Sequence, residues 1–180
     1  MPGSRHLSQR ISEGDGIAII VHVESADAAR AAEQQGAKAI AVMEPVRGIR
    51  DATTLPLLWI GRGAPKDADA CALRPEDDPS DPALETVAEV RDEEELEEAL
   101  ERFDPGVFLL VAPEQDDDEL DPLDAVLELL PDVPAGKLAI AHVDVSTRDE
   151  VLALERAGMD AVLVPAGRVF ELVGDAPVEV

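Results

Sequence analysis

The amino-acid sequence predicts an α/β protein: a shortened (β/α)8 barrel of the TIM type with reduced second to fourth helices. An open parallel α/β sheet is the alternative. Eight short apolar runs alternate with helix-like stretches, which is typical of parallel strands joined by helices. Most runs are apolar throughout, as expected of strands buried on both faces. The chain has 180 residues, whereas such barrels typically need about 250, so we expect a reduced version.

The apolar runs and the signals that end helices set the expected elements. Ser25 is expected to cap a helix that ends at Gly36, and Ser146 to cap a helix that ends at Gly158. Two further helices are expected at 92–103 and 121–130, and a short last one near Gly167. The eight predicted strands are 16–23, 37–43, 55–61, 69–73, 86–90, 106–112, 137–144 and 160–164.

The spaces between the second and fifth strands are too short for full helices. Residues 44–54 and 62–68 leave no room for one, and 77–82 has a loop composition rich in Asp and Pro. We therefore expect the shortening to fall on the second, third and fourth helices. The domain organisation expected is a polar lead-in at 1–15 followed by one compact domain at 16–180.

The charge balance is strongly acidic. The chain has 40 acidic and 15 basic residues, a formal net charge of −25, yet 46% of its residues are apolar, enough for a sizeable core. Such a surface repels nucleic acid and anionic membranes, so neither is expected as a partner. We interpret the acidity as a solvated surface adapted to high salt, as in halophilic proteins, with binding of cations or a basic partner as the alternative.

Location and sulfur chemistry are also constrained. The polar start of the chain lacks a hydrophobic signal segment, and no apolar run approaches the ~20 residues of a membrane helix, so a cytoplasmic location is expected. Cys71 is the single cysteine, which excludes an internal disulfide and favours a small buried residue.

A strand–helix–strand unit occurs twice. Val21-His22-Val23-Glu24-Ser25 precedes a helix, Gly36 and an apolar strand, and His142-Val143-Asp144-Val145-Ser146 precedes a helix, Gly158 and an apolar strand. Such repetition fits a barrel built by duplication, and it is equally the general pattern of βαβ units.

Several stretches resemble one family. VESADAARAAEQQGAKAIAVMEPVRGIR, TTLPLLWIGRG and STRDEVLALERAGMDAVLVPAGRVFE resemble the synthase subunit of pyridoxal 5′-phosphate synthase. EVRDEEELEEAL and the same C-terminal unit are similar, more weakly, to indole-3-glycerol phosphate synthase. The first resemblance implies a phosphate-binding barrel that makes vitamin B6 through lysine imines.

The residues that this resemblance would make functional are replaced. Ile60 and Pro113 stand at the positions of the two catalytic lysines, and His22 stands at that of an aspartate. His142 and Val143 replace the phosphate-binding glycine pair after the seventh strand. Of the lysines present, Lys66 alone is expected near the active end, so we expect a divergent relative that lacks imine chemistry.

Polar residues nevertheless follow two strands at the expected active end. His22 and Glu24 share one side of the first strand by alternation, as do His142 and Asp144 on the seventh, and Glu44 closes the second. These five are the predicted catalytic candidates. His22, His142 and Asp144 are the candidate ligands for a divalent metal such as Zn²⁺, Mn²⁺ or Fe²⁺; apart from this metal no cofactor is predicted.

Anion binding is predicted at the end of the eighth strand. Gly167 and Arg168 begin the expected short helix, a position where barrels bind small phosphorylated ligands. Arg62 and Arg74 end the third and fourth strands and are further candidates for an anionic substrate.

Three functional hypotheses follow. The first is a divergent, non-catalytic relative of the pyridoxal 5′-phosphate synthase barrel with a structural or regulatory role, assembling with itself or with related barrel subunits. The second is an enzyme of different chemistry that uses the histidine and carboxylate cluster, with or without metal. The third is a phosphate-binding lyase or synthase of vitamin B6 biosynthesis that uses Lys66.

Overall fold

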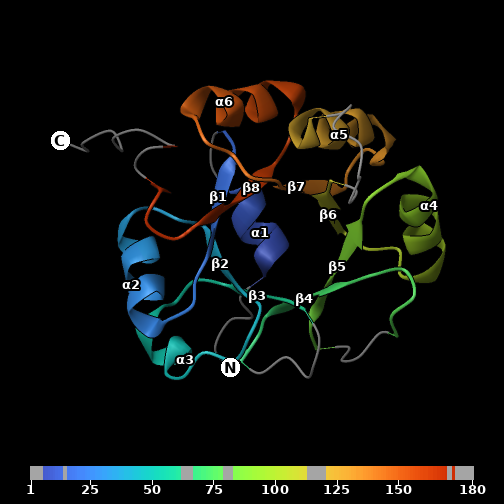
Figure 1. The fold of residues 1–180 in the computed structure, drawn as a ribbon. Coiled ribbons are helices and arrows are strands. Elements are labelled where there is room, and N and C mark those ends of the chain that lie inside the picture. Colours follow the sequence, from blue (N-terminus) through green and yellow to red (C-terminus); the bar gives the residue numbers. More distant parts are fainter. Residues whose placement is uncertain are drawn as a thin grey trace.

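Eight parallel strands close into a barrel in chain order, from β1 next to β2 round to β8 next to β1 (Figure 1). The computed structural model describes residues 6–13, 16–61, 67–78, 83–112, 121–169 and 172. The predicted barrel is therefore confirmed, and the open-sheet alternative is wrong because β8 pairs with β1 along five residues. No helix in these ranges is long and apolar enough to cross a membrane.

The strands lie where the apolar runs predict them, most of them trimmed by one or two residues at their ends. In chain order they are β1 Ala18–His22, β2 Ala39–Val42, β3 Leu57–Ile60, β4 Ala70–Leu73, β5 Glu85–Val90, β6 Val107–Val111, β7 Leu138–His142 and β8 Ala161–Pro165. The difference at the ends is expected, because an apolar run includes flanking residues that are buried without pairing.

The helices cover the barrel unevenly. They are α1 Leu7–Ser12, α2 Ala26–Gln34, α3 Ile49–Ala52, α4 Glu93–Arg102, α5 Pro122–Leu129 with the 3₁₀ turn η1 Leu130–Asp132, and α6 Arg148–Ala157. Between β2 and β3 there is only the four-residue α3, and the described residues between β3 and β5 contain no helix. The predicted reduction of the second to fourth helices is confirmed.

Polar caps fix where the outer helices begin. The Ser25 side chain accepts a hydrogen bond from Ala28 N at 3.1 Å, and the Asp92 side chain accepts one from Glu95 N at 2.8 Å. The predicted cap of α6 is wrong by one residue: Thr147, not Ser146, accepts from Glu150 N, at 3.3 Å. Ser146 instead donates its backbone N–H to the Glu150 side chain, so both residues belong to one capping arrangement.

The barrel interior is filled by levels of four side chains taken from alternate strands, as in other barrels of this type. The strand register builds three apolar levels, with alanines in the lowest and the highest and only larger residues in the middle one. From the N-terminal end upward they are Ala39, Ala70, Val107 and Ala161; then Ile20, Leu58, Val87 and Ile140; then Ala41, Ala72, Leu109 and Leu163.

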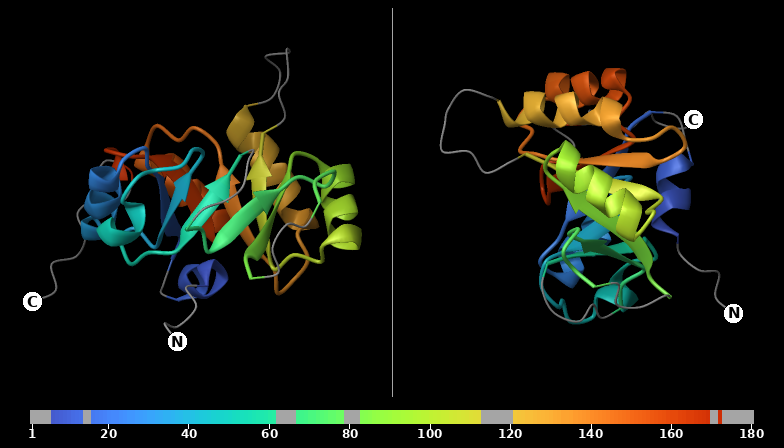
Figure 2. Two further views of the ribbon diagram at one scale, coloured as in Figure 1. Left: turned by 90° about the horizontal axis from the view of Figure 1, so that it is seen from below. Right: turned by 90° about the vertical axis from the view of Figure 1, so that its right-hand side faces the viewer.

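Helix α1 closes the N-terminal end of this barrel (Figure 2). Leu7 and Ile11, 0% and 4% exposed, pack into the interior cluster, and their spacing of four residues puts them on one face of the helix. Glu85 at the start of β5 accepts a hydrogen bond from Ser8 N at 2.9 Å and another from the Ser8 hydroxyl. Helix α1, within the polar lead-in, thus contributes to the core.

Carboxylates also hold the N-terminal ends of the strands together. Asp69 precedes β4 and accepts from Leu57 N of β3 at 2.9 Å, while Asp160 precedes β8 and accepts from Ala139 N of β7 at 2.9 Å. Arg50 pairs with Asp69 at 3.2 Å. This end of the barrel is built for stability.

The position of the α6 cap gives a first test. Thr147→Ala is expected to lower the free energy of unfolding by about 1 kcal/mol, because Glu150 N loses its partner. Ser146→Ala is the matched control and is expected to change it by less than about 0.5 kcal/mol. Denaturant unfolding measures both, and an equal loss in the two variants would contradict the assignment.

The role of α1 gives a second test. Leu7→Ala is expected to cost about 2–4 kcal/mol of unfolding free energy, because it opens a cavity under the lowest interior level. Gln9→Ala, on the exposed side of the same helix, is expected to be nearly neutral. If thermal and denaturant unfolding show Leu7→Ala to be as mild as Gln9→Ala, α1 does not close the barrel.

Candidate functional site

In the fourth interior level, at the C-terminal end of the strands, three of the four side chains are polar. Its members come from the odd-numbered strands: His22 of β1, Ile60 of β3, Glu89 of β5 and His142 of β7. Each continues the inward-facing series of its strand, as Glu89 follows Glu85 and Val87. Because barrel active sites form where the strands end, we call His22, Glu89 and His142 the mouth triad and treat it as the candidate site.

The ring order fixes how the mouth triad is arranged. β5 lies four places from β1 in a ring of eight, so Glu89 and His22 come from opposite sides of the barrel (Figure 1). His142 on β7 lies between them, and the charges of both Glu89 and His22 act on it. A small molecule bound at this end would therefore contact a polar side chain of the protein on each of two opposite sides.

Two arginines hold Glu89. Arg91 Nη2 donates to Glu89 Oε1 at 3.0 Å, and Arg74 Nε lies 3.7 Å from the same oxygen. The Glu89 side chain is only 13% exposed, so its charge is balanced mainly by these two guanidiniums. Arg74 immediately follows β4 and continues its inward series, which places one positive group on each of two adjacent strands.

The pKa of His142 is lowered from the ordinary histidine value. Burial is the largest cause, because desolvation disfavours the imidazolium. Glu89 and Asp144 oppose this effect, while His22 and Arg91 add to it. The His142 ring is consequently neutral at neutral pH, with one nitrogen that donates and one that accepts.

The other predicted catalytic residues are at the rim. Glu24 and Asp144 lie two residues beyond the ends of β1 and β7, and both are exposed, as is Glu44 beyond β2. Asp144 is near enough to influence His142 electrostatically. In the described part of the chain, no three His, Cys, Asp or Glu side chains are grouped as a metal site, so His22, His142 and Asp144 do not form one as they stand. Metal binding stays a prediction.

The predicted phosphate-binding residues lie at the end of β8. Gly167 is exposed, with φ +88°, and the backbone turns helical at Val169. Arg168 Nη2 donates to the carbonyl of Ser146 at 3.0 Å. This bond ties the segment after β8 to the segment after β7. Arg62, Lys66 and Pro113, also named from the sequence, lie outside the described residues.

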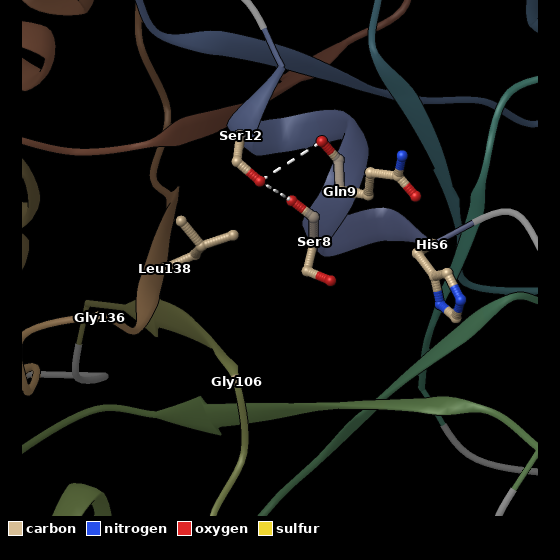
Figure 3. A pocket seen from close by; sticks show the side chains of 7 residues that line it. All are labelled: His6, Ser8, Gln9, Ser12, Gly106, Gly136 and Leu138. Carbon is tan, nitrogen blue, oxygen red and sulfur yellow. Dashed lines mark hydrogen bonds between the residues drawn. The ribbon is translucent and has the colours of Figure 1, made fainter.

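A separate hollow of about 470 Å³ lies at the opposite, N-terminal end (Figure 3). It is lined by α1 and by residues at the starts of β6 and β7: His6, Ser8, Gln9, Ser12, Gly106, Gly136 and Leu138. Its hydroxyls already have partners, since Ser8 bonds to Glu85 and Ser12 donates to the Ser8 carbonyl at 2.5 Å. The hollow therefore belongs to the packing of α1 rather than to the candidate site.

Two members of the site were missed by sequence analysis. Glu89 and Arg91 are not part of the His-x-acid repeat, which marks only the first and seventh strands as candidates. A signal existed: in Glu85–Val90 the acids alternate with Val87, which predicts carboxylates on a single face of a buried strand. A largely buried carboxylate such as that of Glu89 needs a positively charged partner, and Arg91 is the nearest arginine along the chain.

Comparison with known proteins shows the fold and no family. No family model matches the chain, and no curated protein matches it. Solved structures of 252 chains do match. One is the N-acetylmannosamine-6-phosphate 2-epimerase from Clostridium perfringens, which is 16% identical, with a TM-score of 0.61 over 82% of this chain and 86% of that one. The chain is thus a TIM-type barrel, and the resemblance to pyridoxal 5′-phosphate synthase is supported only to that level.

The partly buried imidazole of His142 predicts a pH effect. Because the pKa of His142 is lower in the folded state than in the unfolded state, its contribution is constant above about pH 6.5 and destabilises the fold progressively below it. His142→Gln should therefore lose less unfolding free energy than the wild type between pH 8 and pH 5. Denaturant unfolding gives the free energy of unfolding of both proteins at each pH. The difference between wild type and His142→Gln at pH 8 gives the packing cost of the substitution alone. A difference that is constant with pH would contradict the prediction.

Proposed function

We propose that the protein is an acid–base enzyme of the isomerase or epimerase type, acting at the mouth triad on a small carbonyl compound. The observation that carries this proposal is the placement of Glu89 and His22 on opposite sides of the barrel mouth with the neutral His142 between them. It corresponds to the second sequence hypothesis, with Glu89 added and without a required metal.

The arrangement fits proton transfer at a carbon beside a carbonyl group. The Glu89 carboxylate would take the proton from that carbon, and His142 would donate a hydrogen bond to the carbonyl oxygen as negative charge develops there. His22 would return a proton from the opposite face, and solvent would restore both groups. A neutral imidazole suits the role of electrophile, and the lowered pKa of His142 keeps it neutral.

The comparison with solved structures is consistent with this chemistry at the level of fold. The C. perfringens protein is named as an epimerase of a phosphorylated sugar, and barrels of this type host many other reactions. The proposal therefore depends on the mouth triad, and the likeness supports only that such a barrel can carry a reaction of this class.

Ile60 bears on the remaining hypotheses. The residue at the position of a catalytic lysine in the resembled synthase is an aliphatic side chain, 6% exposed, in the same level as the mouth triad. Since isoleucine cannot form an imine, this favours a function other than vitamin B6 synthesis. A non-catalytic, ligand-binding relative is the second candidate for this reason.

Hydrogen exchange tests the proposal without knowledge of the substrate. The protein would be incubated in D₂O with a panel of aldose phosphates, ketose phosphates and 2-oxo acids, and mass spectrometry would count deuterium gained beside the carbonyl. We expect enzyme-dependent gain of one deuterium in at least one compound. Glu89→Gln should slow it about 100-fold or more, because the proton acceptor is lost.

The matched control is His6→Gln, which alters a histidine at the opposite end of the barrel and should leave the exchange rate unchanged. Absence of exchange across the panel would leave the non-catalytic candidate in place. An undiminished rate in Glu89→Gln would exclude Glu89 as the acceptor.

A further inference from the structure

We infer that Arg74 and Arg91 form an oxyanion-binding subsite in the barrel mouth, and that the compound bound there carries a phosphate or carboxylate group. This inference rests on the proposed function and names its substrate class. It concerns the strands β4 and β5, on the other side of the barrel from the predicted phosphate site after β8.

The first support is the placement of the two guanidiniums. Both follow the inward-facing series of their strands, Ala70, Ala72 and Arg74 on one and Glu85, Val87, Glu89 and Arg91 on the other. Arg74 lies beside Glu89 across the β4–β5 pairing. The charge of Arg91 reaches His142, so Arg91 is on the side of the triad rather than on the outer surface.

The second support is that the subsite already holds an anion. The Glu89 carboxylate accepts a hydrogen bond from Arg91 at 3.0 Å and forms an ion pair with Arg74 at 3.7 Å, so two guanidiniums converge on one oxygen. Guanidinium groups bind carboxylate and phosphate through the same paired N–H geometry. Each guanidinium has five N–H donors, which is more than a single carboxylate can occupy. The two arginines therefore have donors to offer to a second anion.

The third support is accessibility. The Arg74 side chain is 46% exposed and the Arg91 side chain 20%, so a ligand can reach the first while the second is held near the interior. Arg74 is also oriented by its backbone, because its N–H donates to the Asp77 side chain at 2.9 Å. Arg91 is oriented in the same way by Glu95, at 2.7 Å. Both guanidiniums thus extend from anchored backbone.

The fourth support is the contrast with the rest of the surface. A chain with a net charge of −25 repels anions at long range, so an anionic ligand needs a local positive site that acts at short range. Buried or partly buried pairs are screened by salt far less than the surrounding surface charge. Two arginines at the mouth meet this need where a general surface attraction would not.

The subsite also relates to the chemistry. An oxyanion seated on Arg74 and Arg91 would compete with Glu89 for the same donors, and so would release a Glu89 oxygen toward the reacting carbon. Binding of the charged end of the substrate and readiness of the proton acceptor would then be coupled.

Binding of simple anions tests this inference. The protein would be labelled at histidine, and the imidazole NMR signals of His22 and His142 followed during titration with inorganic phosphate or with pyruvate at constant ionic strength set by chloride. We expect a saturable shift of the His142 signal with at least one of the two, and no saturable shift of the His6 signal at the far end. Saturation by phosphate alone indicates phosphate esters, and saturation by pyruvate alone indicates carboxylic acids.

Two variants and a control decide the assignment. Arg74→Gln and Arg91→Gln are each expected to raise the apparent Kd at least about 10-fold, while Arg30→Gln, which breaks an exposed pair with Asp27 on α2, leaves it unchanged. Circular dichroism checks folding, and Arg74→Gln serves if the less exposed Arg91 does not tolerate change. No saturable shift with either anion, or equal affinity in Arg74→Gln and Arg30→Gln, would overturn the subsite.

The failure of this inference is distinguishable from failure of the proposed function. His142→Gln is expected to abolish deuterium exchange while anion binding, followed through His22, persists. Binding without exchange in the wild type would count against the enzyme, and exchange without anion binding would count against the subsite.

Discussion

The interior of a closed eight-strand barrel admits four side chains at each level, and the rest of the structure depends on this limit. The levels can be filled only if the strands keep one register all round, because a slip of one residue would exchange inner and outer faces. Alanines at five of the twelve positions in the three apolar levels leave space for the larger side chains in the same level and for the isoleucines of the level between. The same register that packs these levels brings His22, Glu89 and His142 to one height.

Shortening the chain has changed the outside of the barrel more than the inside. α3 has four residues, yet the outward side chains of β3 and β4 remain buried: Trp59 is 2% exposed and Cys71 6%. The Arg50–Asp69 pair fastens α3 to the start of β4. This reduced barrel keeps a closed strand ring and its levels of four side chains, so side chains of the described strand ends still meet at one end of the barrel.

Sequence analysis predicted the architecture because strand and helix signals are local. Apolar runs, Ser25 as a cap and Gly158 as a left-handed helix end, with φ +101°, need no knowledge of distant contacts. His22 and His142 were chosen as candidates through the repeat. α1 was missed because Leu7 and Ile11 are two apolar residues in a polar stretch, and their burial exists only once the barrel is there to receive them. Glu89 was missed since which face of a strand is inward is decided by closure, a property of all eight strands together.

β5 unites the two ends of the molecule. Barrels of this type usually separate them, with stability at the N-terminal end and chemistry at the C-terminal end, so that one can change without the other. Here Glu85 anchors α1 and Glu89, two inward positions further along the same strand, belongs to the mouth triad. A substitution in α1 that alters the contact with Glu85 therefore acts on the same strand that carries Glu89 at the mouth.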